Sequence, residues 1–129
     1  MKTIRLYESF AGIGSQAKAL DKIAKTKNIN VEKIGVCEFY IDAIIGYISI
    51  HYGNLEQEKQ MSKEQMVQIL NQHLFSSNSK SIVSKDYFNR INENKLRQIF
   101  PYLYAFVNQQ YLHSKNLHGG GDIPIFKYN

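Results

Sequence analysis

A short glycine-containing turn and an acidic residue further along the chain are the groups in this sequence best suited to hold a ligand. The turn is Phe10-Ala11-Gly12-Ile13-Gly14-Ser15, and the acidic residue is Glu38. Glycines let backbone amides approach a ligand closely, and a carboxylate after the next strand can accept hydrogen bonds from ribose hydroxyls. The spacing therefore predicts an adenosine-containing cofactor held between the Gly12 turn and Glu38.

The sequence shows no group of residues that would carry out a reaction on a substrate. The single cysteine, Cys37, excludes an internal disulfide and a cysteine-rich zinc site, and the four histidines do not fall at metal-ligand spacing. Because Cys37 adjoins Glu38 at the end of a predicted strand, we interpret it as a small buried hydrophobe rather than a nucleophile. The sequence predicts no catalytic residue and no metal site.

The elements that must position the turn and Glu38 follow a β-α-β-α order. Strands are predicted at Thr3–Phe10 and Val31–Val36, a helix capped by Ser15 lies between them, and a second helix runs from Ile41 to its end at Gly53. This order predicts an α/β fold with a partial Rossmann-like parallel sheet.

The rest of the chain is predicted to be mostly helical. Ser62 and Gln65 form a capping box that begins a third helix, whose apolar stripe is Met66, Ile69, Leu70 and Leu74. Pro101 is predicted to kink or restart a later helix because it lacks an amide donor. His51, near a helix end, is interpreted as a capping or surface residue.

We expect one incomplete cofactor-binding domain over residues 1–129. Residues 1–53 would form its β-α-β-α core, 54–118 a helical insertion, and 119–129 a short third strand with the chain end.

Two other interpretations of the glycine turn stay open at this point. Gly12, Gly14 and Ala17 also satisfy the dinucleotide pattern G-x-G-x-x-A, with Glu38 where an NAD ribose carboxylate belongs. A structural turn without a ligand is the other. The aromatic Phe10 immediately before the glycines favours a different cofactor, because it can lie against a purine.

Phe10-Ala11-Gly12-Ile13-Gly14-Ser15 resembles the first motif of the DNA cytosine-5 methyltransferases, and Glu38-Phe39 resembles their second. Gly121-Asp122-Ile123 is similar to the third motif, and residues 54–118 are similar to an insertion found in one bacterial and phage branch. The resemblance implies S-adenosyl-L-methionine as cofactor, double-stranded DNA as substrate, and a role in DNA methylation or restriction–modification.

The resemblance also implies a role for each matching residue. Backbone amides around Gly12, Ile13 and Gly14 would face the methionine end of the cofactor. Glu38 would accept from both ribose hydroxyls. The remaining candidates are Phe10 and Phe39 beside the adenine, Asp122 on the adenine amine, and Ala11, Ser15 and Ile123 as parts of the same motifs.

The groups that the family uses for methyl transfer do not occur in these 129 residues. The family places its nucleophilic thiol in a Pro-Cys pair and its acid in a Glu-Asn-Val segment, and neither is present. An arginine-bearing motif and the target-recognition domain are also missing. We therefore expect the chain alone to be inactive, as a split subunit or a truncated remnant. The alternative is a small non-enzymatic binding or inhibitor protein that reuses the fold.

Composition and charge set the remaining expectations. The formal net charge of +5 suits contact with a polyanion, although the lysines are scattered. Residues that could touch DNA phosphates are Lys80, Lys85, Arg90, Lys95 and Arg97. With no long apolar segment and no signal-peptide core, a cytoplasmic protein without membrane contact is expected.

The predicted first strand raises the question of a partner. In the complete fold of the family that strand is central, so Thr3–Phe10 would here leave one edge unpaired. We expect a complementing methyltransferase chain at this edge, or a homodimer through it.

Overall fold

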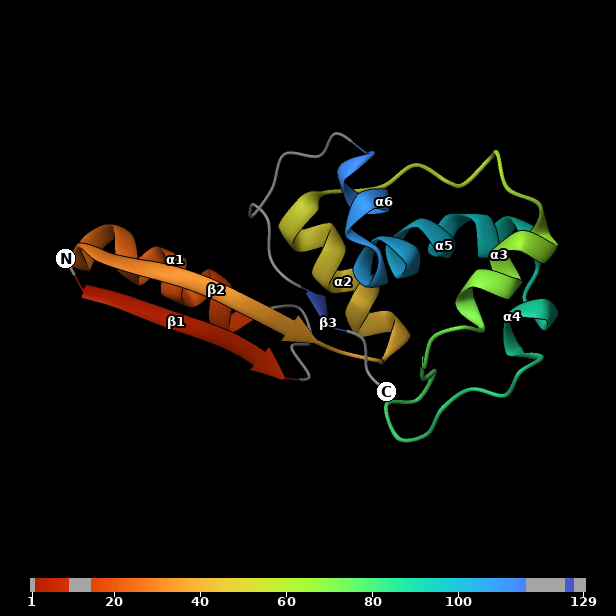
Figure 1. Cartoon of the computed structure of the whole chain (residues 1–129), viewed down its shortest axis with the longest axis horizontal. Helices are drawn as coiled ribbons and strands as arrows, with labels where there is room; N and C mark the ends of the chain where they lie inside the picture. Colours follow the sequence, from red (N-terminus) through yellow and green to blue (C-terminus); the bar gives the residue numbers. More distant parts are fainter. Residues whose placement is uncertain (1, 10–14, 116–124, 127–129) are drawn as a thin grey trace.

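The computed structural model describes residues 2–9, 15–115 and 125–126. The elements are β1 (Lys2–Ser9), α1 (Ser15–Lys27), β2 (Ile29–Cys37), α2 (Ile41–Tyr52), α3 (Lys63–Leu70), α4 (Tyr87–Arg90), α5 (Glu93–Val107), α6 (Gln109–His113) and β3 (Ile125–Phe126). Figure 1 shows β1, α1 and β2 extending from a body that contains the other helices; we call the first three elements the N-terminal unit and residues 41–115 the helical body.

The sheet is small and its described strands are parallel, in the order β1-β2-β3. Residues Lys2 to Ser9 of β1 pair along β2, ending with Ser9 beside Cys37. At the other edge of β2, Val36 and Cys37 pair with Ile125 and Phe126. The prediction of a mixed α/β chain with a parallel sheet is confirmed, with its third strand two residues long.

Two helix ends were predicted correctly from neighbouring residues. Gly53 ends α2 with a φ of 95°, a conformation that favours glycine, and its amide donates to the Ser49 carbonyl at 3.0 Å. The capping box is also confirmed: the Gln65 amide donates to Ser62 Oγ at 3.2 Å, and the Ser62 amide donates to Gln65 Oε1 at 2.9 Å.

The third helix is shorter than its apolar stripe predicts. It ends at Leu70, so Leu74 lies outside it. Asn71 caps this end, and its side-chain amide donates to the Lys85 carbonyl at 3.0 Å, which draws the chain toward a distant segment. The apolar spacing continues to Leu74, but the helix ends at Asn71, whose side chain bonds to a distant part of the chain.

Pro101 does not restart the later helix, because α5 runs through it from Glu93 to Val107. A proline in a helix leaves the carbonyl four residues earlier without its usual amide donor. That carbonyl belongs to Arg97, and it accepts a hydrogen bond from the main-chain amide of Glu58 at 2.9 Å. Of the two predicted outcomes the restart is therefore wrong, and another segment supplies the missing donor; the kink stays a prediction.

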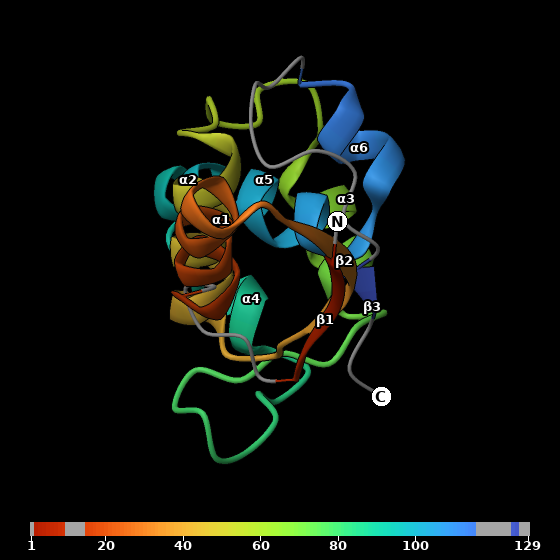
Figure 2. The ribbon, with the colours of Figure 1, turned by 90° about the vertical axis from the view of Figure 1, so that its left-hand side faces the viewer.

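The hydrophobic core lies in the helical body, between Ile41 and Leu112. Its fully buried members include Tyr47 and Ile48 of α2 and Phe100 and Leu103 of α5. In the N-terminal unit, by contrast, every side chain with a described exposure is half-buried or exposed. Seen end-on, α1 lies on one side of the β1–β2 pair (Figure 2).

Among the described residues, the helices are all too short or too polar to span a bilayer.

Candidate cofactor site

The carboxyl ends of β1 and β2 lie side by side, because Ser9 and Cys37 are direct partners in the parallel pair. Glu38 and Phe39 follow β2 directly in the chain. Ligands of open parallel sheets bind beyond the carboxyl ends of the strands. The candidate site is therefore the edge at which β1 leads toward the glycine turn and β2 leads into Glu38.

Several predicted site residues fall outside the part of the chain that is described. They are Phe10, Ala11, Gly12, Ile13, Gly14, Asp122 and Ile123. Ser15 is the first residue of α1, within one residue of the capping position that the sequence predicts. Its side chain lies outside the described part of the structure. Their roles stay predictions.

Glu38 and Phe39 are both buried, at 7% and 9% exposure. The Phe39 amide donates to Glu38 Oε2 at 3.0 Å, so one carboxylate oxygen is bonded to the main chain of the next residue. A carboxylate has two oxygens that each accept more than one hydrogen bond. Glu38 is thus a buried hydrogen-bond acceptor at the carboxyl-end edge of the sheet.

The backbone next to Glu38 is hydrogen-bonded to Ser76, which follows the third helix. The Ser76 amide donates to the Phe39 carbonyl at 2.8 Å, and the Ile41 amide donates to the Ser76 carbonyl at 2.9 Å. Tyr40 and Ser76 form a parallel bridge, and Ser76 is fully buried. The segment after α3 therefore fastens the helical body to the candidate site.

Beyond Ser76 the chain forms an exposed loop, Ser77–Lys85, organised by the side chain of Asn78. Asn78 Oδ1 accepts from the amides of Lys80 at 2.8 Å and Ser81 at 3.0 Å. Ser76 Oγ donates to the same oxygen at 3.2 Å. These bonds hold the loop while Ser79 adopts a φ of 65°.

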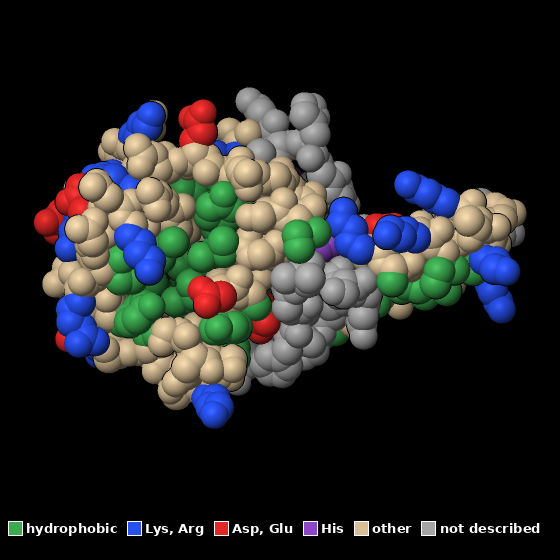
Figure 3. Space-filling model, turned by 180° about the vertical axis from the view of Figure 1, so that it is seen from behind, with side chains coloured by type: hydrophobic (Ala, Val, Ile, Leu, Met, Phe, Trp, Pro, Cys, Tyr) green, Lys and Arg blue, Asp and Glu red, His purple; other side chains and the backbone are tan. Residues whose placement is uncertain are grey.

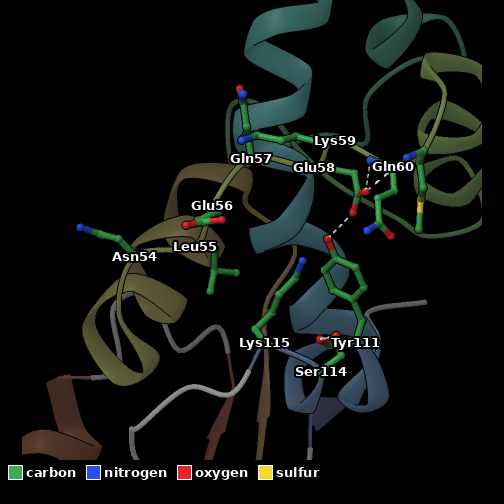
Figure 4. Close-up of a pocket in the computed structure, with 11 residues that line it drawn as sticks. Asn54, Leu55, Glu56, Gln57, Glu58, Lys59, Gln60, Tyr111, Ser114 and Lys115 are labelled. Atoms are coloured by element: carbon green, nitrogen blue, oxygen red, sulfur yellow. Dashed lines mark hydrogen bonds between the residues drawn. The ribbon is translucent and has the colours of Figure 1, made fainter.

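A separate hollow of about 770 Å³ lies on the helical body. Figure 4 shows its lining, which comes from the irregular segment Asn54–Met61 and from the end of α6 and the residues after it, with Tyr111, Ser114 and Lys115. Glu58 is 6% exposed there, and its carboxylate accepts from the Tyr111 hydroxyl at 2.8 Å and the amides of Gln60 and Met61 at 2.9 and 3.2 Å.

The charge of Glu58 is stabilised in place. Burial alone would raise the pKa of its carboxyl, but the hydrogen bonds from Tyr111, Gln60 and Met61, with the nearby charge of Lys115, outweigh burial and lower the pKa. Burial, together with the hydrogen bond to Glu58 and the negative charge there, raises the pKa of Tyr111 above its usual range. Through these bonds Glu58 joins the Asn54–Met61 segment to α6, so we assign it a structural role.

Two interpretations of polar residues need correction. His51 is 2% exposed rather than a surface residue, because its ring stacks on Tyr47 with centroids 4.2 Å apart. Arg97 is not available to DNA, since Nη1 donates to the carbonyls of Glu58 and Met61, both at 2.9 Å.

On the face seen from behind, lysine and arginine side chains are scattered rather than gathered into one patch (Figure 3). Within the described ranges, groups of three potential metal-ligating side chains do not occur.

The acidic–aromatic pair of the second motif, Glu38-Phe39, is thus buried directly after a parallel strand pair. Comparison with known proteins confirms the resemblance that the sequence motifs indicated: the chain is related to the methyltransferases. A similar protein is the orphan methyltransferase M.SssI of Spiroplasma monobiae, 38% identical over 101 residues. The match covers 77% of this chain and 25% of that relative, so the chain spans about a quarter of the relative's length. No family model matches.

Proposed function

We propose that this chain binds S-adenosyl-L-methionine as the cofactor-binding part of a DNA cytosine-5 methyltransferase. In this proposal the strands belong to a Rossmann-like sheet, and the protein acts on double-stranded DNA in the cytoplasm, in DNA methylation or restriction–modification. The proposal rests on one relationship above all, the buried Glu38 carboxylate at the carboxyl end of β2, next to the end of β1.

The types of residue in the candidate site suit an adenosine group. Glu38 would accept hydrogen bonds from the ribose hydroxyls, and Phe39 would lie along the adenine. Phe10 would flank the adenine, the amides of Gly12 and Gly14 would face the methionine end, and Asp122 would accept from the adenine amine. The bound cofactor would supply the methyl group.

Transfer of that group needs chemistry that these residues do not hold. Methylation at carbon 5 of cytosine requires a thiolate that attacks carbon 6, on a base flipped out of the duplex. The one cysteine, Cys37, precedes Glu38 and follows no proline. We therefore propose that the nucleophile and the acid come from residues beyond this segment, and that this chain alone binds cofactor without transferring the methyl group.

A complementing methyltransferase chain is the proposed source of those residues. In the described part of the sheet β1 pairs with β2 alone, so its other edge has main-chain groups that could pair with a further strand. A homodimer through that edge is the competing arrangement, and sedimentation of the chain with and without a candidate partner distinguishes the two.

The class of ligand is tested by calorimetric titration of the whole chain with S-adenosyl-L-methionine, S-adenosyl-L-homocysteine and NAD. The expected result is saturable binding of the two S-adenosyl compounds and no binding of NAD. Preference for NAD would show that the dinucleotide interpretation of Gly12, Gly14 and Ala17 is correct. Binding of none of the three would favour a non-enzymatic protein that reuses the fold.

A further inference from the structure

We propose that the exposed loop Ser77–Lys85 is a surface of this chain that contacts the phosphates of duplex DNA. The inference rests on the proposed function, because it concerns the substrate of that function. It concerns a segment that the cofactor motifs do not include.

The position of the loop is the first support. The loop leaves the helical body directly after Ser76, whose main chain is hydrogen-bonded to Phe39 and Ile41 beside Glu38. Figure 1 shows the segment between α3 and α4 projecting from the body. A substrate that must reach the methyl group of a cofactor held at Glu38 therefore passes close to the root of this loop.

The charge of the segment is the second support. Residues 65–85 contain no aspartate or glutamate, while Lys80 and Lys85 are both exposed. The next acid along the chain is Asp86, whose carboxylate accepts from Ser84 Oγ at 2.6 Å and pairs with Arg90 at 3.4 Å. Its negative charge is thus partly balanced, and an approaching phosphate meets two ammonium groups.

The third support is that the loop presents suitable donors in a fixed shape. Phosphates in DNA complexes are bound by lysine, serine and asparagine side chains and by backbone amides. Exposed hydroxyls come from Ser77, Ser79 and Ser81, whereas the Ser84 hydroxyl is already donated to Asp86. The hydrogen bonds at Asn78 hold the loop in shape before binding, which reduces the ordering cost of association.

The structure also separates these lysines from the other basic candidates. Arg97 is bound to main-chain carbonyls and Arg90 is paired with Asp86. Of the five basic residues that sequence reasoning offered, Lys80 and Lys85 are the two that lie in the loop rooted at the candidate cofactor site.

The test compares two charge-reversal variants of equal net charge. The first is Lys80→Glu with Lys85→Glu, and the control is Lys25→Glu with Lys59→Glu, at exposed positions on α1 and on the Asn54–Met61 segment. Each exchange removes one positive charge and adds one negative charge, so both double variants fall from +5 to +1. Binding to a short mixed-sequence DNA duplex is measured between about 50 and 200 mM salt.

We expect the loop variant to bind duplex DNA at least about 10-fold more weakly than the control variant, with a shallower dependence on salt, by up to about two in the logarithmic slope. Affinity for S-adenosyl-L-methionine should be equal in both variants, and circular dichroism should show that both fold. Equal loss of DNA binding in the two variants, or no DNA binding by the unaltered chain, would overturn the inference. Selective loss in the loop variant without any binding of S-adenosyl-L-methionine would support the loop as a DNA surface and contradict the proposed cofactor.

Discussion

The main-chain amide of Glu58 donates a hydrogen bond to the main-chain carbonyl of Arg97 at 2.9 Å. This carbonyl is available because Pro101, four residues later in α5, has no amide to offer it. The Arg97 guanidinium adds bonds to the carbonyls of Glu58 and Met61. One turn of α5 thus holds the irregular segment Asn54–Met61 against the helical body.

We predict that Arg97→Met lowers the free energy of unfolding by about 2 kcal/mol, because two partly buried main-chain carbonyls lose a charged donor. Arg90→Met is the matched control. Arg90 is 66% exposed and its pair with Asp86 spans 3.4 Å, so its loss should cost less than about 1 kcal/mol. Denaturant unfolding of the three proteins measures the difference, and equal losses would show that the guanidinium of Arg97 does not secure the segment.

The Glu58 carboxylate predicts a dependence of stability on pH. Its pKa is lower in the folded protein than its ordinary value, so the unfolded chain binds more protons in acid. The stabilisation is fully present above the ordinary glutamate pKa of about 4.3 and is lost as the pH falls through the folded pKa.

The variant Glu58→Gln should therefore be less stable than the unaltered chain at neutral pH, and the gap should shrink below about pH 4.3. Glu56→Gln, at an exposed position of the same segment, is the control and should leave the pH profile unchanged. The check is denaturant unfolding at a series of pH values. A gap that stays constant into acid would mean that the charge of Glu58 does not stabilise the fold.

The N-terminal unit should open more easily than the helical body. Its strands are hydrogen-bonded, but its described side chains are half-buried or exposed, whereas α2 and α5 carry fully buried residues such as Ile44 and Phe100. Hydrogen exchange followed by mass spectrometry should show at least about 10-fold lower protection in β1 than in α5. Equal protection would mean that the two parts unfold together.

Signals carried by neighbouring residues were sufficient for much of the fold. The capping box of Ser62 and Gln65 and the terminating glycine Gly53 act within one helical turn, so sequence alone located them. The β-α-β-α order likewise predicted a parallel sheet, since strands joined by a helix cannot pair as a tight hairpin.

The errors occurred where a distant partner decided the outcome. His51 stacks on Tyr47 of the same helix, and this pair lies against the body because the Tyr47 ring meets Phe106 from α5. α5 continues through Pro101 because of an amide from Glu58. Ser76 lay in a serine-rich stretch typical of a loop, and no local pattern indicated that its main chain would pair beside Glu38. For the candidate site, the sequence identified Glu38 and Phe39. The hydrogen bonds that join their main chain to Ser76 were seen only in the structure.

The central claim is that the Glu38 carboxylate accepts hydrogen bonds from an S-adenosyl ribose. Calorimetric titration of S-adenosyl-L-methionine into Glu38→Ala, with Glu64→Ala at an exposed position of α3 as control, tests it most directly. Loss of a charged hydrogen bond of about 1.5 to 3 kcal/mol should weaken binding by about 10-fold or more in Glu38→Ala and leave the control unchanged. Unaltered affinity in a correctly folded Glu38→Ala protein would contradict the account.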